Sequence, residues 1–172
     1  MNPDHPSSPR LPFLVVLVVG LGLTGCGVMF SSLMHLAACP LCIVQRMLYL
    51  SLALCGVLGL LLTKRRAACF VLLPLMVSVA ATGVFVAGYQ SWLQRFQRFA
   101  SCAADYPWWE QLVDWAGERV PLLFRASGSC SEPGWKLLGL SIAEMSLIAF
   151  SALFLLSAFA LWQTARRKAR LN

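Results

Sequence analysis

The sequence is poor in charged residues. Only 12% of its 172 residues are Asp, Glu, Lys or Arg, against roughly 25% in an average soluble domain. Hydrophobic residues make up 59%, and the mean hydropathy is +0.72. This balance excludes a disordered chain, a small secreted disulfide-rich domain and an ordinary cytosolic enzyme. The length suits one domain or a small helical bundle.

The apolar residues are gathered into long runs, as in an integral membrane protein. A helix needs about 20 residues to cross a hydrocarbon core of about 30 Å, and four runs are that long. Such segments must be helical, because a single strand would leave its backbone polar groups unpaired in lipid. We therefore expect an all-α membrane protein, a four-helix transmembrane bundle in one domain, with spans at about 11–30, 43–62, 67–89 and 142–162.

The net charge of +7 does not point to nucleic acid, because the basic residues cluster at the ends of the apolar runs. With four spans, eight of them fall on one side, which the positive-inside rule makes cytoplasmic. Both termini should then be cytoplasmic, and the loops at about 31–42 and 90–141 external. The eight residues are Arg10, Lys64, Arg65, Arg66, Arg166, Arg167, Lys168 and Arg170.

The first span permits a second interpretation. Arg10 followed by an apolar stretch resembles a signal sequence, and Leu23-Thr24-Gly25-Cys26 resembles a bacterial lipoprotein cleavage box. Such a box normally precedes a polar linker, whereas the residues after Cys26 stay apolar. Processing and lipidation at Cys26 would remove the first span but leave the external loops external.

The seven cysteines fall into two groups by position. Three lie inside apolar runs, where thiols behave as small hydrophobic side chains: Cys26, Cys55 and Cys69. Four lie in the predicted external loops, where an oxidising compartment permits disulfides: Cys39, Cys42, Cys102 and Cys130. From the residues alone, these four could be redox-active, could form two structural disulfides, or could contribute to a zinc site together with His35.

Cys39-Pro40-Leu41-Cys42 is predicted to begin the second span, because Pro40 suits the first position of a helix. Cys42 then lies in the first turn, near free backbone N–H groups and the positive end of the helix dipole. Arg46 shares a face with Cys42 one turn later. Both effects favour a thiolate at Cys42. An arginine inside a span is a functional candidate, although at this depth its side chain could extend to the headgroups instead.

The segment at about 107–120 is predicted to be a short amphipathic helix. Because tryptophan favours the lipid–water boundary, we expect this helix to lie on the membrane, and a small folded cap over the bundle is the alternative. The small residues at 126–129 predict a mobile flank before Cys130. The apolar side of the helix contains Trp108, Trp109, Leu112, Val113, Ala116 and Val120.

Four spans, a CxxC that opens the second span, and two cysteines in a long loop before the fourth resemble the disulfide bond formation protein B (DsbB) family over nearly the whole chain. The resemblance implies a four-helix-bundle quinone reductase of the bacterial inner membrane. It would reoxidise DsbA, a periplasmic dithiol oxidase of thioredoxin fold. The most specific matches are Cys39-Pro40-Leu41-Cys42-Ile43-Val44-Gln45-Arg46, and Cys130 followed by Trp135, Leu138, Gly139, Leu140 and Met145.

On these positions, the resemblance implies that the partner's thiolate attacks a Cys102–Cys130 disulfide and forms a mixed disulfide at Cys102. Electrons then pass to the Cys39–Cys42 pair, with a Cys39–Cys130 bond as an intermediate. Cys42 donates to a bound ubiquinone or menaquinone, and Arg46 stabilises the negative charge that develops. We expect no metal site.

Gln90 occupies roughly the place where many relatives have a histidine near the quinone, so the resemblance assigns Gln90 no role at the quinone site. Vitamin K epoxide reductases also couple loop cysteines to quinones, but their redox CxxC lies late in the bundle. The non-enzyme alternative is a membrane adaptor or metal-binding protein with structural disulfides, which would neither bind quinone nor exchange with a soluble dithiol. A membrane oxidase dedicated to one unusual partner is a third possibility.

Overall fold

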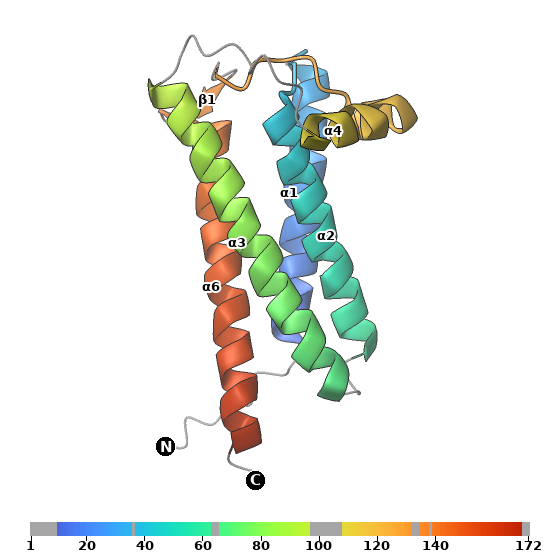
Figure 1. Cartoon of the computed structure of the whole chain (residues 1–172), viewed down its shortest axis with the longest axis vertical. Coiled ribbons are helices and arrows are strands. Elements are labelled where there is room, and N and C mark those ends of the chain that lie inside the picture. The colour runs from blue at the N-terminus through green and yellow to red at the C-terminus, as the bar shows by residue number, and fades with distance from the viewer. Residues whose placement is uncertain are drawn as a thin grey trace.

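The computed structural model describes residues 10–35, 37–62, 66–96, 108–131, 135–137 and 139–169. Each of its long helices contains a segment long and apolar enough to cross a membrane. The prediction of an all-α, multi-pass membrane protein with four spans is therefore confirmed. Figure 1 shows the four helices running along one another: α1 (Leu11–Leu33), α2 (Pro40–Leu62), α3 (Arg66–Phe96) and α6 (Ile142–Ala169).

Short elements gather at the end of the bundle where α2 and α6 begin (Figure 1). Two short helices, α4 and α5, follow each other there, and two strands of two residues each, β1 and β2, pair antiparallel. The start of α1 and the end of α6 lie at the opposite end, as an even number of spans requires. The bounds are α4 (Trp108–Arg119), α5 (Pro121–Phe124), β1 (Lys136–Leu137) and β2 (Leu140–Ser141).

The bundle consists of two closely packed helix pairs, α1 with α2 and α3 with α6, which meet where α2 packs on α3. Glycines let α1 and α2 approach closely, because a Cβ at Gly56 would lie 2.8 Å from the carbonyl oxygen of Phe13. Tyr49 of α2 joins the two pairs. Its ring stacks on Phe150 of α6 with centroids 4.1 Å apart, and its hydroxyl lies 2.8 Å from the Ser146 hydroxyl.

α3 continues to Phe96, beyond the predicted end of the third span at about residue 89. Four of the seven residues added are polar, which is why hydropathy ends the span too early. Gln90, Ser91 and Gln94 are nevertheless buried. The Ser91 hydroxyl donates to the Ala87 carbonyl at 2.8 Å, within the helix itself. The helix therefore extends past the apolar run by burying three of its polar side chains.

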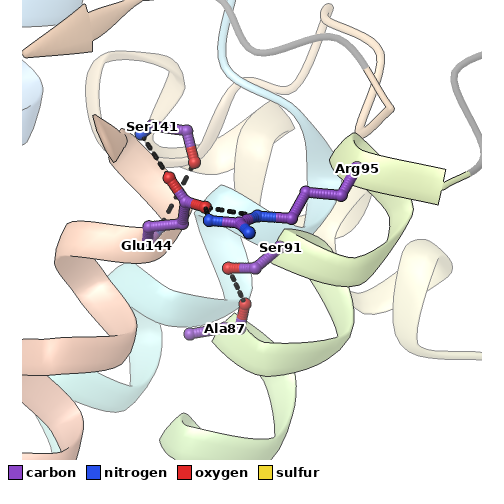
Figure 2. A network of polar contacts seen from close by, with 5 residues as sticks. All are labelled: Ala87, Ser91, Arg95, Ser141 and Glu144. Atoms are coloured by element: carbon purple, nitrogen blue, oxygen red, sulfur yellow. Dashed lines mark hydrogen bonds and ion pairs between the residues drawn. The ribbon is translucent and has the colours of Figure 1, made fainter. Parts of the chain in front are cut away.

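The loop-side end of α3 is joined to the start of α6 (Figure 2). Arg95 forms an ion pair with Glu144. The Ser141 N–H donates to Glu144 Oε2 at 2.8 Å, and the Glu144 N–H donates to the Ser141 hydroxyl at 3.3 Å, which is a reciprocal capping box. Because the Arg95 side chain is 66% exposed, the ion pair adds little stability, and the capping box fixes where α6 begins.

We expect Gly56→Ala to lower the free energy of unfolding by about 1–3 kcal/mol, the usual cost of overpacking. The added Cβ would meet the Phe13 carbonyl at 2.8 Å and the Leu17 Cβ at 2.9 Å, so α1 and α2 would have to separate. Denaturant unfolding in detergent micelles measures the effect. Gly22→Ala is the matched control, since nothing lies within 4 Å of a Cβ there. Equal effects of the two substitutions would contradict the close crossing.

Candidate active site

Three cysteine sulfurs meet where the long loop reaches the start of α2. Cys39 directly precedes α2, Cys42 lies in its first turn, and their Sγ atoms are 3.1 Å apart. The thiol of Cys130, from the long loop, is hydrogen-bonded to that of Cys39. Cys39 and Cys130 are both buried. Cys102, the fourth cysteine of the predicted site, lies outside the described residues.

The position of Cys130 is set by backbone hydrogen bonds between the two loops. The N–H groups of Ser127 and Gly128 donate to the carbonyl oxygen of Ala38, at 2.9 and 3.0 Å. The backbones approach so closely that a Cβ at Gly128 would lie 2.3 Å from the Ala37 carbonyl oxygen. The flank that the sequence predicts to be mobile is docked in the described structure, where both N–H groups are paired.

The hydrogen bond between Cys39 and Cys130 shifts the pKa values of these two thiols in opposite directions. Donation from the Cys39 thiol, assisted by the backbone N–H of Leu41, holds the pKa of Cys130 below its usual value, against the opposing effect of burial. The hydrogen bonds to Cys130 and Cys42, together with burial, raise the pKa of Cys39. Of the two, Cys130 is therefore the better thiolate, and it lies in contact with a protonated Cys39.

Arg46 is partly buried, and its guanidinium is hydrogen-bonded to two neighbouring helices. Its Nη1 donates to the Leu123 carbonyl oxygen of α5 at 3.1 Å, and its Nη2 donates to the Gly27 carbonyl oxygen at 3.2 Å and the Ser31 hydroxyl at 2.7 Å, both on α1. All three acceptors are neutral. The guanidinium also lies close enough to Cys42 to interact with it electrostatically. Its positive charge is thus placed beside the sulfurs, with no carboxylate among its described partners.

Two buried glutamines complete the site. Gln90 Nε2 of α3 lies 3.2 Å from the Sγ atoms of both Cys39 and Cys42. Gln45 Nε2 of α2 donates to Gln90 Oε1 at 2.7 Å. The sequence predicts a role for neither residue. The spacing of Gln45, three residues after Cys42 and hence on the same helix face, was the signal that could have indicated it.

Apolar side chains surround the sulfurs. Leu41, Leu93 and Val86 pack on them from α2 and α3, and Trp109 of α4 covers them from the loop side. Around these three cysteines the described residues therefore form a largely dry enclosure. Electrostatic interactions and hydrogen bonds are stronger in such surroundings than in water.

α4 has two apolar faces, whereas the sequence predicted one. Trp109, Val113 and Ala116 face the protein. Trp108, Leu112 and Trp115 point outward and are 76%, 48% and 53% exposed. The inner face agrees with the cap interpretation, and the outer tryptophans suit a membrane surface. The two interpretations, treated as alternatives from the sequence, apply to neighbouring faces of one helix.

The remaining cysteines lie apart from this cluster. Cys55 and Cys69 belong to the main apolar core, as expected for thiols inside the spans. Cys26 is exposed on α1, so it is not a core thiol. Within the part of the chain that the structure describes, no group of three His, Cys, Asp or Glu residues is arranged to hold a metal ion.

We expect Gly128→Ala to reduce formation of a Cys39–Cys130 disulfide by about tenfold or more, because the new Cβ would displace the docked flank from Ala37. The yield after mild oxidation is measured by peptide mass spectrometry, with Cys42 and Cys102 replaced by serine. Ser127→Ala is the matched control, since its side chain is exposed and its backbone N–H is kept. An unchanged yield in Gly128→Ala would show that the docking does not position Cys130.

The chain is similar to known proteins over most of its length. It matches the family model for disulfide bond formation protein DsbB over residues 9–160, which include the four cysteines of the two loops. It is 40% identical to disulfide bond formation protein B of Dechloromonas aromatica over 135 residues, which cover 77% of this chain and 80% of that protein. It is 32% identical to the proteins of that name from Albidiferax ferrireducens, over 94% of this chain and 92% of the relative, and Aromatoleum aromaticum, over 94% and 95%. The chain therefore belongs to the disulfide bond formation protein B family, a family of membrane thiol oxidoreductases.

Proposed function

We propose that this protein reoxidises a DsbA-like periplasmic dithiol oxidase and passes the electrons to the quinone of the bacterial inner membrane. The observation that carries the proposal is the contact of Cys130 with Cys39, which in turn contacts Cys42. These contacts form a continuous path of sulfur atoms from the long loop to the first turn of a membrane span. Two permanent structural disulfides, Cys39–Cys42 and Cys102–Cys130, would not need Cys130 beside Cys39.

The proposed exchange conserves disulfide bonds at each step. The partner's thiolate attacks Cys102 of the Cys102–Cys130 disulfide, and Cys130 leaves as a thiolate. Cys130 then attacks Cys39 of the Cys39–Cys42 disulfide, and Cys42 leaves. The partner's second thiol releases Cys102, whose thiolate attacks Cys130 and frees Cys39. The partner has then lost two electrons and two protons, and Cys39 and Cys42 have gained them. The lowered pKa of Cys130 suits it to leave in one step and to attack in the next.

The residues beside Cys42 fit a quinone. A bound ubiquinone or menaquinone would supply the two-electron acceptor for the reduced cysteine pair. Cys42 stands at the helix N-terminus, where the dipole favours a thiolate. Arg46 has only neutral acceptors among its described partners, so its charge is available to stabilise negative charge in this enclosure. The same guanidinium holds α1 and α5 against α2, so it also shapes the site.

The direction of insertion in this proposal follows from charge. The eight basic residues that flank the spans support a topology with both termini in the cytoplasm and the cysteine-bearing loops in the periplasm. A periplasmic location is oxidising, and it is where a soluble dithiol oxidase could reach the long loop.

The partner is tested by trapping. Oxidised protein mixed with a reduced DsbA-like oxidase that lacks its resolving cysteine should accumulate a mixed disulfide at Cys102, because the partner has no second thiol to release it. Mass spectrometry of the cross-linked peptide identifies the cysteine. Trapping at Cys130 would reverse the order of electron entry, and trapping at Cys39 would make the long loop dispensable. No trapping at any external cysteine would contradict the proposal.

The quinone role of Arg46 is tested by turnover. Arg46→Ala should lower quinone reduction by about 10²–10³, the usual effect of removing one preorganised electrostatic group. Arg46→Lys should lower it less, because it keeps the charge but loses the planar fork. The assay follows quinone absorbance with reduced partner in excess. Ser31→Ala removes one hydrogen bond to Arg46 and keeps the charge, so its effect should be much smaller. Normal turnover of Arg46→Ala at limiting quinone would contradict the role.

A further inference from the structure

Two glutamine side chains are buried where α2 packs on α3. Gln90 is 1% exposed and Gln45 is 4% exposed. A carboxamide is costly to bury unless its polar atoms find partners, and the described partners here are each other and two sulfur atoms. The pair is therefore placed so that its hydrogen bonds end on Cys39 and Cys42.

Gln90 has the right number of donors for these sulfurs. An amide nitrogen carries two N–H groups and no acceptor, and Gln90 Nε2 lies 3.2 Å from Cys39 Sγ and 3.2 Å from Cys42 Sγ. One N–H can thus be directed at each sulfur. Such a bond is weak to a neutral sulfur and about twice as strong when the acceptor is ionised. Gln90 consequently binds the reduced pair, which can carry a thiolate, better than the disulfide.

Gln45 fixes which end of Gln90 faces the sulfurs. Its Nε2 donates to Gln90 Oε1 at 2.7 Å, which leaves the Gln90 nitrogen pointing at the cysteines. In the reverse orientation, the Gln90 oxygen would face a thiolate and its nitrogen would face another donor. Both contacts would be repulsive, so donation from Gln45 favours the orientation in which the Gln90 nitrogen faces a thiolate.

We infer that the Gln45–Gln90 pair stabilises the reduced form of the Cys39–Cys42 pair, with Gln90 as the direct donor and Gln45 as a positioning residue. The half-reaction is that of any disulfide, in which the S–S bond takes two electrons and two protons to give two thiols, one of which can ionise. A carboxamide does not titrate, so it stabilises the thiolate without exchanging a proton. This inference rests on the thiol–disulfide chemistry of the proposed function. It adds that the two glutamines make the Cys39–Cys42 disulfide a better electron acceptor.

The inference is tested by redox equilibrium with glutathione, which supplies and accepts the electrons. The full-length protein is purified free of quinone, with Cys102 and Cys130 replaced by serine, and the Cys39–Cys42 disulfide fraction is measured by alkylation and mass spectrometry. Gln90→Leu should make reduction of the pair about tenfold less favourable, which corresponds to about 30 mV for a two-electron couple. Gln45→Leu should shift the equilibrium in the same direction by a smaller factor.

A double variant separates this role from simple packing. Once Gln90 is leucine, Gln45 has no amide to orient, so adding Gln45→Leu should cause no further shift. Gln94→Leu is the matched control, because Gln94 lies one turn further along α3 and is also buried, at 9% exposure, and its side-chain oxygen accepts no described hydrogen bond. Its equilibrium should match that of the parent protein.

Several results would overturn the inference. These are unchanged equilibria in both Gln90→Leu and Gln45→Leu, fully additive shifts, or an equal shift in Gln94→Leu. If Gln90→Leu does not fold, an unchanged equilibrium in Gln45→Leu is sufficient to overturn it. Neither quinone nor partner is present in this measurement, so its outcome is independent of whether the chain passes electrons from a DsbA-like oxidase to quinone.

Discussion

The active site depends on two backbone hydrogen bonds to the carbonyl oxygen of Ala38. They dock the residues before Cys130 onto the residues before Cys39, and so place a long-loop cysteine against the start of a span. Without them, Cys130 would reach Cys39 only by a random encounter of a long loop, with the entropy loss of loop closure. With them, the entropy loss of closing the loop occurs when the protein folds, and Cys130 and Cys39 are already packed together.

The seam between the two helix pairs determines where the polar groups of the site can lie. Within each pair, small and apolar residues allow close packing, as at Gly56. The contact of α2 with α3 instead carries the hydrogen bond between Gln45 and Gln90, and Tyr49 of α2 reaches across to Ser146 of α6. In a medium of low dielectric constant these bonds are strong, and their partners are costly to lose. They therefore align the two pairs in one register and aim Gln90 at the cysteines.

The four spans could be predicted because the free energies of transferring successive apolar side chains into lipid add up along the chain. The true end of α3 could not, because burial of Gln90, Ser91 and Gln94 depends on neighbouring helices and not on local hydropathy. The same reason applies to α4, whose apolar residues cover two different surfaces, while a helical pattern indicates only that they are apolar.

The cysteines and the arginine of the candidate site could be predicted from the sequence. The contacts that hold them in place could not. CxxC at a helix start and Arg46 one turn later follow from helix geometry. The approach of Cys130 to Cys39 came from family resemblance alone, because the backbone donors of Ser127 and Gly128 have no side-chain signature. The neutral acceptors of Arg46, from α1 and α5, likewise became evident only when the chain was folded.

The dry enclosure formed by Trp109, Leu41 and Leu93 has a consequence for charge. A bare anion is costly where water is excluded, and Arg46 is the one guanidinium described as interacting with these sulfurs. One thiolate can be neutralised there, but a second would be left without a counterion. In the proposed exchange, electrons that enter this cluster must therefore bring protons with them, so the site would transfer the equivalent of hydrogen and stay close to electrically neutral.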